Sequence, residues 1–357
     1  MKLQQIVETV LSRAVIDRND KTIAWIDTKN IGHKYLINEM SDDLYYGLAG
    51  ILIFFIELKK NGINLNKNII DLLDNTIKKR IISNTSTFHS DHGAILGFSS
   101  IIYAGMYASK SQMNLKFINH EELVLEQLFN IKNDVYSLDF IDGLSGTLYV
   151  LSKKFKLDGD RAILKYIKNL SEEIIARVDE VEVAGLAHGM AGIYLSLSEY
   201  YGINQENKLK KIIKYLIQKE NKIWNEAVNE WRDLRGVNDY TKRWCNGSIG
   251  IHFVRRKVSN EHKELIDNLS LKMSLKSIKR SAFYVEKSNL CCGRVSEIFL
   301  DEVKHDLSTK SPNFSDSLDN NINLGLFSGI TGLGLAILKS RNQFIPNILL
   351  LELPNEN

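Results

Sequence analysis

A short motif, in which two residues separate a pair of glycines, recurs along this chain and constrains its fold more than any other feature. The complete copies begin at Gly47, Gly143, Gly189, Gly247 and Gly329. Two degenerate copies fill the gaps: Gly93-Ala-Ile-Leu-Gly97 has one extra residue, and Gly293-Arg-Val-Ser296 lacks the second glycine. Successive copies lie 46, 50, 46, 58, 46 and 36 residues apart. Intervals of this size predict a repeated pair of helices.

The segments between these motifs have the apolar periodicity of amphipathic helices. Prolines occur only at 312, 346 and 354, so the first 311 residues contain none of the strongest helix breakers. Five segments place Leu and Ile on one face and Lys and Glu on the other. These predicted helices are Asn68–Ile82, His120–Ile131, Asp160–Val178, Glu206–Trp224 and Glu261–Lys279. We find no convincing alternation of a β-strand.

The repeat predicts apolar inner helices opened by glycine and amphipathic outer helices that face water. Closing such an array into a ring removes the exposed ends that an open solenoid must cap. We therefore predict an all-α fold, an α/α toroid of about seven helix pairs that residues 1–357 form as a single domain. An open all-helical solenoid is the alternative. The last interval is too short for a full pair and Ser308–Asn323 has the composition of a polar loop, so one outer helix is expected to be abbreviated.

Composition excludes several other classes of protein. The 357 residues are 44% hydrophobic and 25% charged, as in an ordinary globular protein. The net charge is only +3 and the basic residues are scattered, so nucleic acid is not an expected partner. The least interrupted apolar stretch, Leu324–Leu338, contains four glycines and is too short to cross a bilayer, so no transmembrane segment is predicted. Met1–Asp17 lacks the features of a secretory signal, which predicts a cytoplasmic location.

If the glycines mark equivalent points, the residues just before them lie around one rim of the ring. The residue immediately before the first glycine is polar or reactive in each of the seven copies, namely Tyr46, His92, Asp142, His188, Asn246, Cys292 and Ser328. One position earlier, Cys245 and Cys291 occupy equivalent places in adjacent repeats. The three cysteines of the chain are therefore expected to meet where two inner helices begin.

Three cysteines at such a place suggest a metal site. Helix N-termini favour anions and lower thiol pKa values. Thiolates in a cytoplasmic protein favour zinc, and three protein ligands with a fourth position open are typical of a catalytic zinc site. Cys245, Cys291 and Cys292 are thus candidate ligands of Zn²⁺. The alternative is that they pack as small buried side chains.

Other rim residues are candidates for acid–base or structural roles. His188, one repeat before Cys245, is a candidate general acid–base, with a capping or core role as the alternative. His92 and Asp142 lie two or more repeats from the cysteines and are expected to be hydrogen-bonding residues. Packing roles are expected for Trp244, Tyr45 and Tyr46.

The chain resembles the LanC-like lanthionine synthetases, a family of lanthipeptide cyclases, along nearly its whole length. The motifs that carry the resemblance are Leu44–Gly50, Asp139–Gly146, His188–Gly192, Trp244–Gly247, Leu290–Gly293, Gly329–Gly334 and Ile345–Glu352. Most members have a cysteine–histidine pair where this chain has Cys291 and Cys292. The chain is therefore most similar to the three-cysteine cyclase domains of some bifunctional class II synthetases.

The resemblance implies an α/α toroid with catalytic Zn²⁺ that acts in lantibiotic biosynthesis. In the implied reaction, a peptide cysteine thiol adds to dehydroalanine or dehydrobutyrine and forms a thioether ring. The three cysteines would bind the zinc, His188 would be the acid–base, and Asp139 would be the nearby catalytic carboxylate. Asp142 is the competing carboxylate.

The chain also departs from the family pattern. The arginine expected four residues before Cys245 is absent, because Thr241 stands there. Lys242 or Arg243 is the candidate substitute, and a different mode of enolate stabilisation is the alternative.

The expected partners follow from the same resemblance. They are a dehydrated precursor peptide, a separate dehydratase and an export transporter, which would give the cytoplasmic enzyme a peripheral place at the membrane. The main alternative function is a non-catalytic scaffold that binds zinc and a peptide or glutathione. A helical-toroid glycosidase is less favoured, because it needs two carboxylates at catalytic separation.

Overall fold

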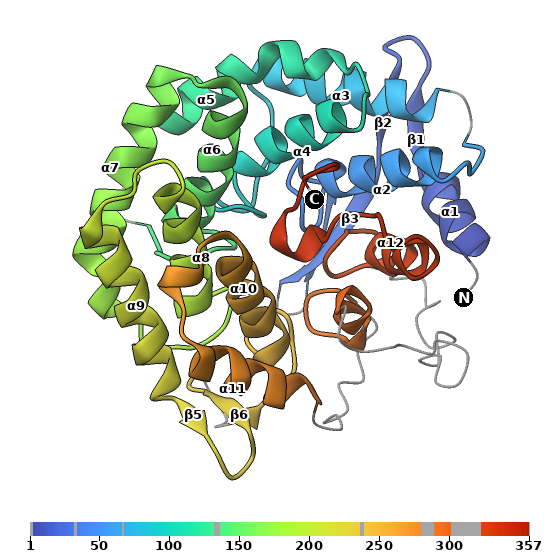
Figure 1. The fold of residues 1–357 in the computed structure, drawn as a ribbon. Helices are drawn as coiled ribbons and strands as arrows, with labels where there is room; N and C mark the ends of the chain where they lie inside the picture. The colour runs from blue at the N-terminus through green and yellow to red at the C-terminus, as the bar shows by residue number, and fades with distance from the viewer. Residues whose placement is uncertain are drawn as a thin grey trace.

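The computed structural model describes residues 3–31, 34–65, 68–131, 136–235, 239–279, 289–300 and 323–356. In these residues, helices form two concentric layers around a common axis (Figure 1). The inner layer consists of α2 (Leu48–Lys60), α4 (Ser99–Lys110), α6 (Leu144–Asp158), α8 (Met190–Tyr201), α10 (Ser248–Glu261), the 3-10 helix η4 (Arg294–Phe299) and α12 (Ile330–Arg341). The outer layer consists of α3 (Ile69–Ser83), α5 (Glu121–Phe129), α7 (Arg161–Arg177), α9 (Asn207–Asn221) and α11 (Asn268–Lys279). The predicted all-α toroid is confirmed.

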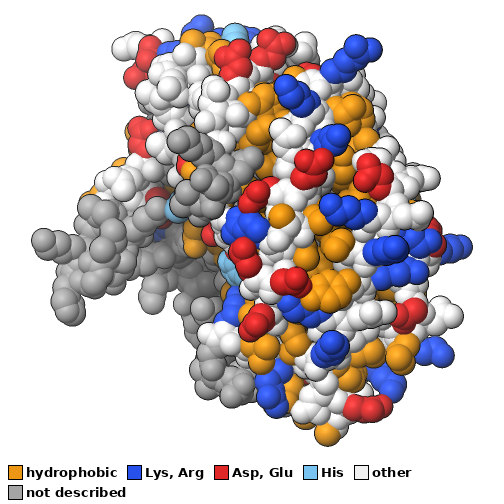
Figure 2. All heavy atoms as spheres, turned by 90° about the vertical axis from the view of Figure 1, so that its left-hand side faces the viewer, with side chains coloured by type: hydrophobic (Ala, Val, Ile, Leu, Met, Phe, Trp, Pro, Cys, Tyr) orange, Lys and Arg blue, Asp and Glu red, His pale blue; other side chains and the backbone are white. Residues whose placement is uncertain are grey.

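The outer helices are amphipathic, as their sequences predicted. Helix α7 buries Ile163, Ile167, Leu170 and Ile174, which follow one another at helical spacing. Its first turn is capped by Asp160, whose carboxylate accepts the Ala162 amide at 2.7 Å. On the face that α7 and α9 form, basic and acidic side chains are interspersed, with apolar side chains between them (Figure 2).

The N-terminal and C-terminal parts of the chain meet to close the ring. Helix α12 contacts α2 and η4 in the inner layer, and α1 (Leu3–Ser12) packs against α12. After α12 the chain continues into the short 3-10 helix η6 (Ile348–Leu350). The N-terminal helix thus takes an outer position beside the last inner helix. The predicted loop Ser308–Asn323 lies, except for its last residue, outside the described residues.

Backbone hydrogen bonds connect the loops before the inner helices into a closed circle. In each repeat, the residue two positions before the repeat glycine accepts a backbone hydrogen bond at its carbonyl from the preceding repeat. The donor is the backbone amide of the residue at the same position in that preceding repeat. The first repeat is the exception, because there the Leu44 amide is the donor. The residues involved are Leu44, Tyr45, Ile95, Ile141, Ala187, Cys245, Cys291 and Phe327, at distances of 2.8–3.3 Å. These bonds fix the loops, and the side chains they carry, side by side.

The second repeat has a different register from the one predicted. Ile95 occupies the equivalent place in the circle, and α4 begins at Ser99, so the repeat glycine is Gly97 and not Gly93. The rim position of this repeat is therefore held by Leu96, and the expectation of His92 at that position is wrong. His92 is fully buried, and its Nδ1 lies 3.2 Å from Thr147 Oγ1, which agrees with a hydrogen-bonding role.

Two further predictions differ from the structure. The sixth inner segment, which lacks the second glycine, is the 3-10 helix η4, in which Ser296 Oγ donates to the Gly293 carbonyl at 3.1 Å. Short antiparallel strands are also present, although none was predicted. They are β1 (Val15–Asp17), β2 (Thr22–Ala24), β3 (Ile26–Ile31), β4 (Lys34–Glu39), β5 (Trp224–Asn225), β6 (Glu230–Asp233) and β7 (Asp239–Tyr240). Most of these strands have only two to four residues, and the six-residue strands β3 and β4 do not alternate apolar with polar residues.

The predicted helix bounds agree with the structure to within a few residues, except at the start of the last segment. Glu261 ends α10, and a 3-10 helix, η3 (Lys263–Leu265), comes before α11. None of the helices in the described residues has the length and apolar character needed to cross a bilayer.

Candidate metal centre and acid–base site

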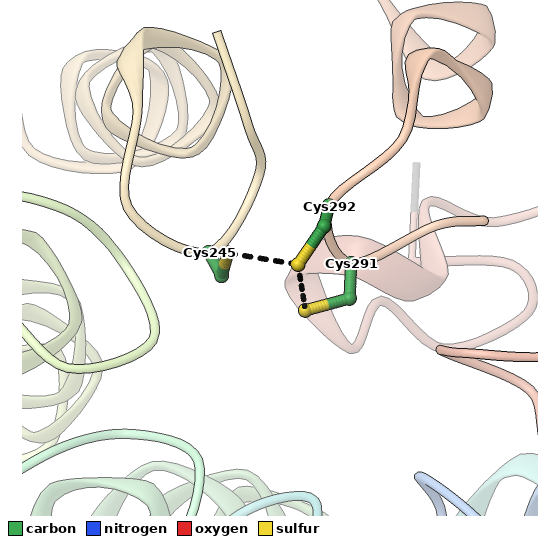
Figure 3. Close-up of side chains that lie close together, drawn as sticks. All are labelled: Cys245, Cys291 and Cys292. Carbon is green, nitrogen blue, oxygen red and sulfur yellow. Dashed lines mark hydrogen bonds between the residues drawn. The ribbon is translucent and has the colours of Figure 1, made fainter. Parts of the chain in front are cut away.

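The three cysteines lie together where α10 and η4 begin. Cys245 comes from the loop before α10, and Cys291 and Cys292 come from the loop before η4 (Figure 3). Cys292 Sγ lies 3.7 Å from Cys245 Sγ and 3.4 Å from Cys291 Sγ. The three are thiols and form no disulfide. The Cys245 amide donates to the Cys291 carbonyl at 3.3 Å, so the closed circle of backbone bonds aligns the two loops.

The cluster fits the donor set of a zinc site. Sulfur ligands about 2.3 Å from a tetrahedral ion lie about 3.8 Å from each other, close to the observed sulfur separations. All three sulfurs are within 4.8 Å of one another. Cys245 and Cys291 are buried, while Cys292 is half-buried, which leaves an approach from solvent.

The electrostatics of the cluster favour neutral thiols unless a cation is bound. Contact with Cys291 and Cys292, together with burial, raises the pKa of Cys245 well above its usual value. A hydrogen bond with Cys245 lowers the pKa of Cys291, but contact with Cys292 and burial outweigh it and raise this pKa to about 12. A divalent cation inverts this balance, because it stabilises the adjacent thiolates directly.

Tyr45 belongs to this cluster, although a packing role was predicted for it. Burial raises the pKa of the Tyr45 hydroxyl, and so do the charge of Cys291 and a hydrogen bond to it. The ring of Tyr45 also stacks on Phe327, with ring centroids 5.5 Å apart. The register contained a usable signal, because Tyr45 stands two residues before its repeat glycine, as do Cys245 and Cys291.

His188 and Asp139 form a hydrogen-bonded pair on the loops before α8 and α6. His188 Nδ1 lies 2.8 Å from Asp139 Oδ2, and the other carboxylate oxygen of Asp139 accepts the Asp142 amide at 3.1 Å. Asp139 thus has two roles: one oxygen fixes its own loop, and the other orients the imidazole. The His188 side chain remains 38% exposed, so its ring can be reached from solvent.

The charge of Asp139 makes His188 easier to protonate than a free histidine. Burial lowers the pKa of His188, but the hydrogen bond and charge of Asp139 outweigh it, so the pKa is raised. Burial favours the neutral form of Asp139, whereas hydrogen bonds from His188 and Asp142 lower its pKa below the usual value. An ionised Asp139 that raises the pKa of the adjacent imidazole is suited to acid–base chemistry.

The acid–base pair and the thiol cluster lie on adjacent loops. Ala187, which precedes His188, donates its amide to the Cys245 carbonyl at 2.8 Å and accepts the Phe140 amide at 3.0 Å. The order around the ring is therefore Asp139, His188, Cys245 and the vicinal cysteines. The rim position Asn246, beside Cys245, is half-buried.

The cations near the site differ from those expected. Lys242 is buried, and its Nζ donates to the Ile278 carbonyl of α11 at 3.3 Å. Arg243 is half-buried, and its Nε has no hydrogen-bond partner among the described residues. Arg235, which follows β6, acts electrostatically on His188 and was missed in the sequence. The sequence pointed to Arg235 only indirectly, because this residue lies in the longest interval between repeat glycines, from Gly189 to Gly247.

Arg235 is held by a neighbouring carboxylate. Its Nε and Nη2 donate to Asp233 at 3.1 and 3.0 Å, and its backbone amide donates to the same carboxylate at 3.1 Å. The guanidinium is therefore held in a two-point ion pair in the turn just after β6.

The fold and the site together define the class: a helical toroid with a thiol cluster and a histidine–aspartate pair on its rim. The chain belongs to the family of lanthionine synthetase C-like proteins, whose family model matches residues 38–322.

Known proteins that are similar to this chain include a lantibiotic biosynthesis protein and a solved cyclase structure. The lacticin 481/lactococcin biosynthesis protein LcnDR2 of Lactococcus lactis subsp. lactis is 26% identical over 377 aligned residues. The match covers 93% of this chain but 37% of that protein, so the chain spans little more than a third of its relative's length. Among solved structures, nisin cyclase has the same fold, with a TM-score of 0.67 and 18% identity over 98% of this chain and 96% of that one.

Proposed function

We propose that this chain is a zinc-dependent lanthipeptide cyclase, which adds peptide cysteine thiols to dehydroalanine or dehydrobutyrine. The observation that carries the proposal is the placement of three thiols and a histidine–aspartate pair on neighbouring loops. Family membership and the relative named for lacticin 481 biosynthesis support the same reaction. We propose Cys245, Cys291 and Cys292 as the zinc ligands, and His188 and Asp139 as the catalytic pair.

The chemistry of thioether formation matches the proposed roles. Zinc, when bound, would lower the pKa of the substrate thiol and supply a thiolate at neutral pH. As the sulfur–carbon bond forms, the π-electron pair of the alkene moves toward the adjacent carbonyl and creates an enolate. His188, held by Asp139, gives a proton to the α-carbon. The proton released by the thiol balances the one taken up, so the net reaction consumes none.

We assign stabilisation of the enolate to Arg235. A fixed cation beside a developing negative charge lowers the barrier without reorganising solvent. Arg235 acts on His188 and is fixed by Asp233, whereas the Lys242 amine is bound to the outer layer. We expect Arg235→Ala to slow ring closure with zinc content unchanged. A larger loss in Arg243→Ala would move the assignment to that residue.

Metal analysis tests the ligand assignment. We expect about one tightly bound zinc per chain in the wild type, as for a single three-ligand catalytic site, and its loss in Cys291→Ala. The matched control is Ser328→Ala, a substitution on the same rim outside the cluster. Zinc retained in Cys291→Ala would refute the assignment.

Incubation with a dehydrated, cysteine-containing peptide tests the reaction. Addition of a thiol to an alkene leaves the peptide mass unchanged, so ring formation is followed by alkylating the remaining thiols before mass spectrometry. We expect thiols to disappear faster than without enzyme, and at the non-enzymatic rate in Cys291→Ala. Thiols that persist beside zinc-loaded wild-type protein would favour the scaffold function.

The His188→Ala variant separates catalysis from structure. Loss of a general acid–base slows a reaction by roughly 10²–10⁴-fold, and we expect ring closure to slow by that amount while zinc is retained. Zinc lost together with activity would instead assign His188 a structural role.

We also propose that residues 1–357 act as one cyclase domain on a dehydrated precursor peptide. The packing of α1 on α12 supports a single unit, since both ends of the described chain take part in the ring. A separate dehydratase and an exporter are the proposed partners, in the cytoplasm or at the membrane surface. Co-purification of these proteins with the chain, with and without precursor peptide, tests this proposal.

A further inference from the structure

A second carboxylate stands beside the His188–Asp139 pair and takes no part in the steps above. Side-chain ligand atoms of Asp142, Asp139 and His188 lie within 4.8 Å of one another. Asp142 Oδ1 is buried and has no hydrogen-bond partner among the described residues. The backbone around it is fixed, because its amide donates to Asp139 and its carbonyl accepts Ser90 Oγ at 2.8 Å.

The same ring contains a second histidine–aspartate pair, in which a tyrosine stands at the position of Asp142. Asp43 and Asp139 both stand four residues before the repeat glycine, and each accepts the backbone amide of the residue three positions on. Asp43 Oδ2 contacts His89 Nδ1 at 2.5 Å. The residue immediately before the glycine is Tyr46 in the first repeat, where the third repeat has Asp142.

We propose that Asp142 is a positioning residue that sets how readily His188 releases its proton. As a neutral carboxyl, Asp142 leaves the imidazole with one negative neighbour, Asp139. As a carboxylate, it adds a second negative charge and holds the proton on the ring. The consequence for ring closure rests on the proposed cyclase function, whereas the charge coupling between the two side chains does not.

The charges around the pair make this coupling effective near neutral pH. Burial and contact with Asp139 raise the pKa of Asp142 to about 7. Arg235, from the turn after β6, opposes protonation of His188. The loop of the second repeat contributes Asp91, whose carboxylate accepts the Tyr136 hydroxyl at 2.5 Å. Asp142 is thus a neighbour of His188 whose charge changes near neutral pH.

The proposed effect on the reaction follows from proton transfer to the enolate. After the sulfur–carbon bond has formed, the imidazolium N–H bond of His188 breaks and a C–H bond forms at the α-carbon. The proton lost by the substrate thiol restores the imidazolium, so the cycle balances. A second carboxylate makes the imidazolium a weaker acid, so a neutral Asp142 favours this transfer.

The test is an NMR titration of histidine side chains in the full-length, zinc-loaded chain, with the His188 signal assigned from His188→Gln. A charge at this distance shifts a neighbouring pKa by roughly one unit or more. We therefore expect a coupled, two-step titration of His188 in the wild type. In Asp142→Asn we expect one step, with the pKa lower by about one unit. Asp142→Ala should give the same shift, and His89, beside Asp43, serves as the internal control and should not change.

Three outcomes would overturn the proposal. The first is an unchanged His188 titration in both variants, and the second is an equal shift of His188 and His89. The third is a second zinc per chain that is lost in Asp142→Asn, because Asp142 would then be a metal ligand. The titration needs no peptide, so a failure of the cyclase assay would refute the proposed function and leave the charge coupling to be judged separately.

Discussion

Replacing Gly146 by alanine tests the close packing that joins the repeats. A Cβ atom at this position would lie 1.9 Å from the Phe140 carbonyl oxygen and 2.2 Å from the Ala94 amide nitrogen. These two backbone atoms form a hydrogen bond of 3.0 Å between the loops of adjacent repeats. Neither atom belongs to a flexible side chain, so a loop must move to admit the methyl group.

The expected cost combines two terms. Overpacking of a close-packed region costs about 1–3 kcal/mol. Loss of a buried hydrogen bond costs about 0.5–1.5 kcal/mol. Alanine is a better helix former than glycine by about 0.5–1 kcal/mol, which offsets part of the loss at the start of α6. We therefore expect Gly146→Ala to lower the free energy of unfolding by about 0.5–4 kcal/mol.

Gly105 provides the matched control because it lies in the middle of α4, where a Cβ atom fits. Its closest neighbour, Phe117 Cε2, would be 3.6 Å away, an ordinary van der Waals contact. Gly105→Ala should therefore stabilise the chain by about 0.5–1 kcal/mol. The assay is urea unfolding followed by tryptophan fluorescence, with the wild type alongside. Equal stabilities for the two variants, or a neutral Gly146→Ala, would refute the packing argument.

Three further predictions concern the site. Asp139→Asn keeps an oxygen that can accept the loop amide but removes the charge beside His188. We expect ring closure to slow roughly 10²–10⁴-fold while the zinc content stays unchanged. Near-normal rates would contradict the role of the carboxylate. The pKa of Asp142 is raised from 3.8 to about 7 in the folded chain, so its stabilising contribution is complete below about pH 4 and is lost as the pH rises through 7. Urea unfolding should thus show a weaker fall in stability over this range in Asp142→Asn than in the wild type, and parallel curves would argue against it. Zinc removal by a chelator should lower the Tm of the wild type but not of Cys291→Ala, since only a bound ion adds stability; equal shifts would indicate that the chelator acts elsewhere.

Much of the architecture was predictable because the repeat is a local pattern with a strict packing requirement. The start of each inner α-helix lies against loop backbone, where a Cβ atom would not fit. Glycine is therefore required there, and its near-regular spacing in the sequence revealed the repeat. The outer helices were readable because one face is buried and the other solvated. The second repeat was misread because both Gly93 and Gly97 precede α4, and only backbone pairing distinguishes them. Gly93 has a φ of +109° and serves a turn, whereas Gly97 is the repeat glycine.

The candidate site was predictable only as far as its residues follow the repeat. Spacing alone brought Cys245 and Cys291 to equivalent places in adjacent repeats, and the structure has their sulfurs in one cluster. Tyr45 shares their position but looked like a packing residue, because the sequence does not show where its hydroxyl points.

The sequence by itself determined the helical ring and the order of the loops around it, since glycine spacing and helical periodicity are local properties that survive without tertiary context. Only the tertiary structure decided which side chains meet. The contact of Asp142 with the His188–Asp139 pair depends on hydrogen bonds between loops of different repeats, and the approach of Arg235 depends on a strand inserted between α9 and α10. Such contacts join residues far apart in the chain, and no spacing rule encodes them.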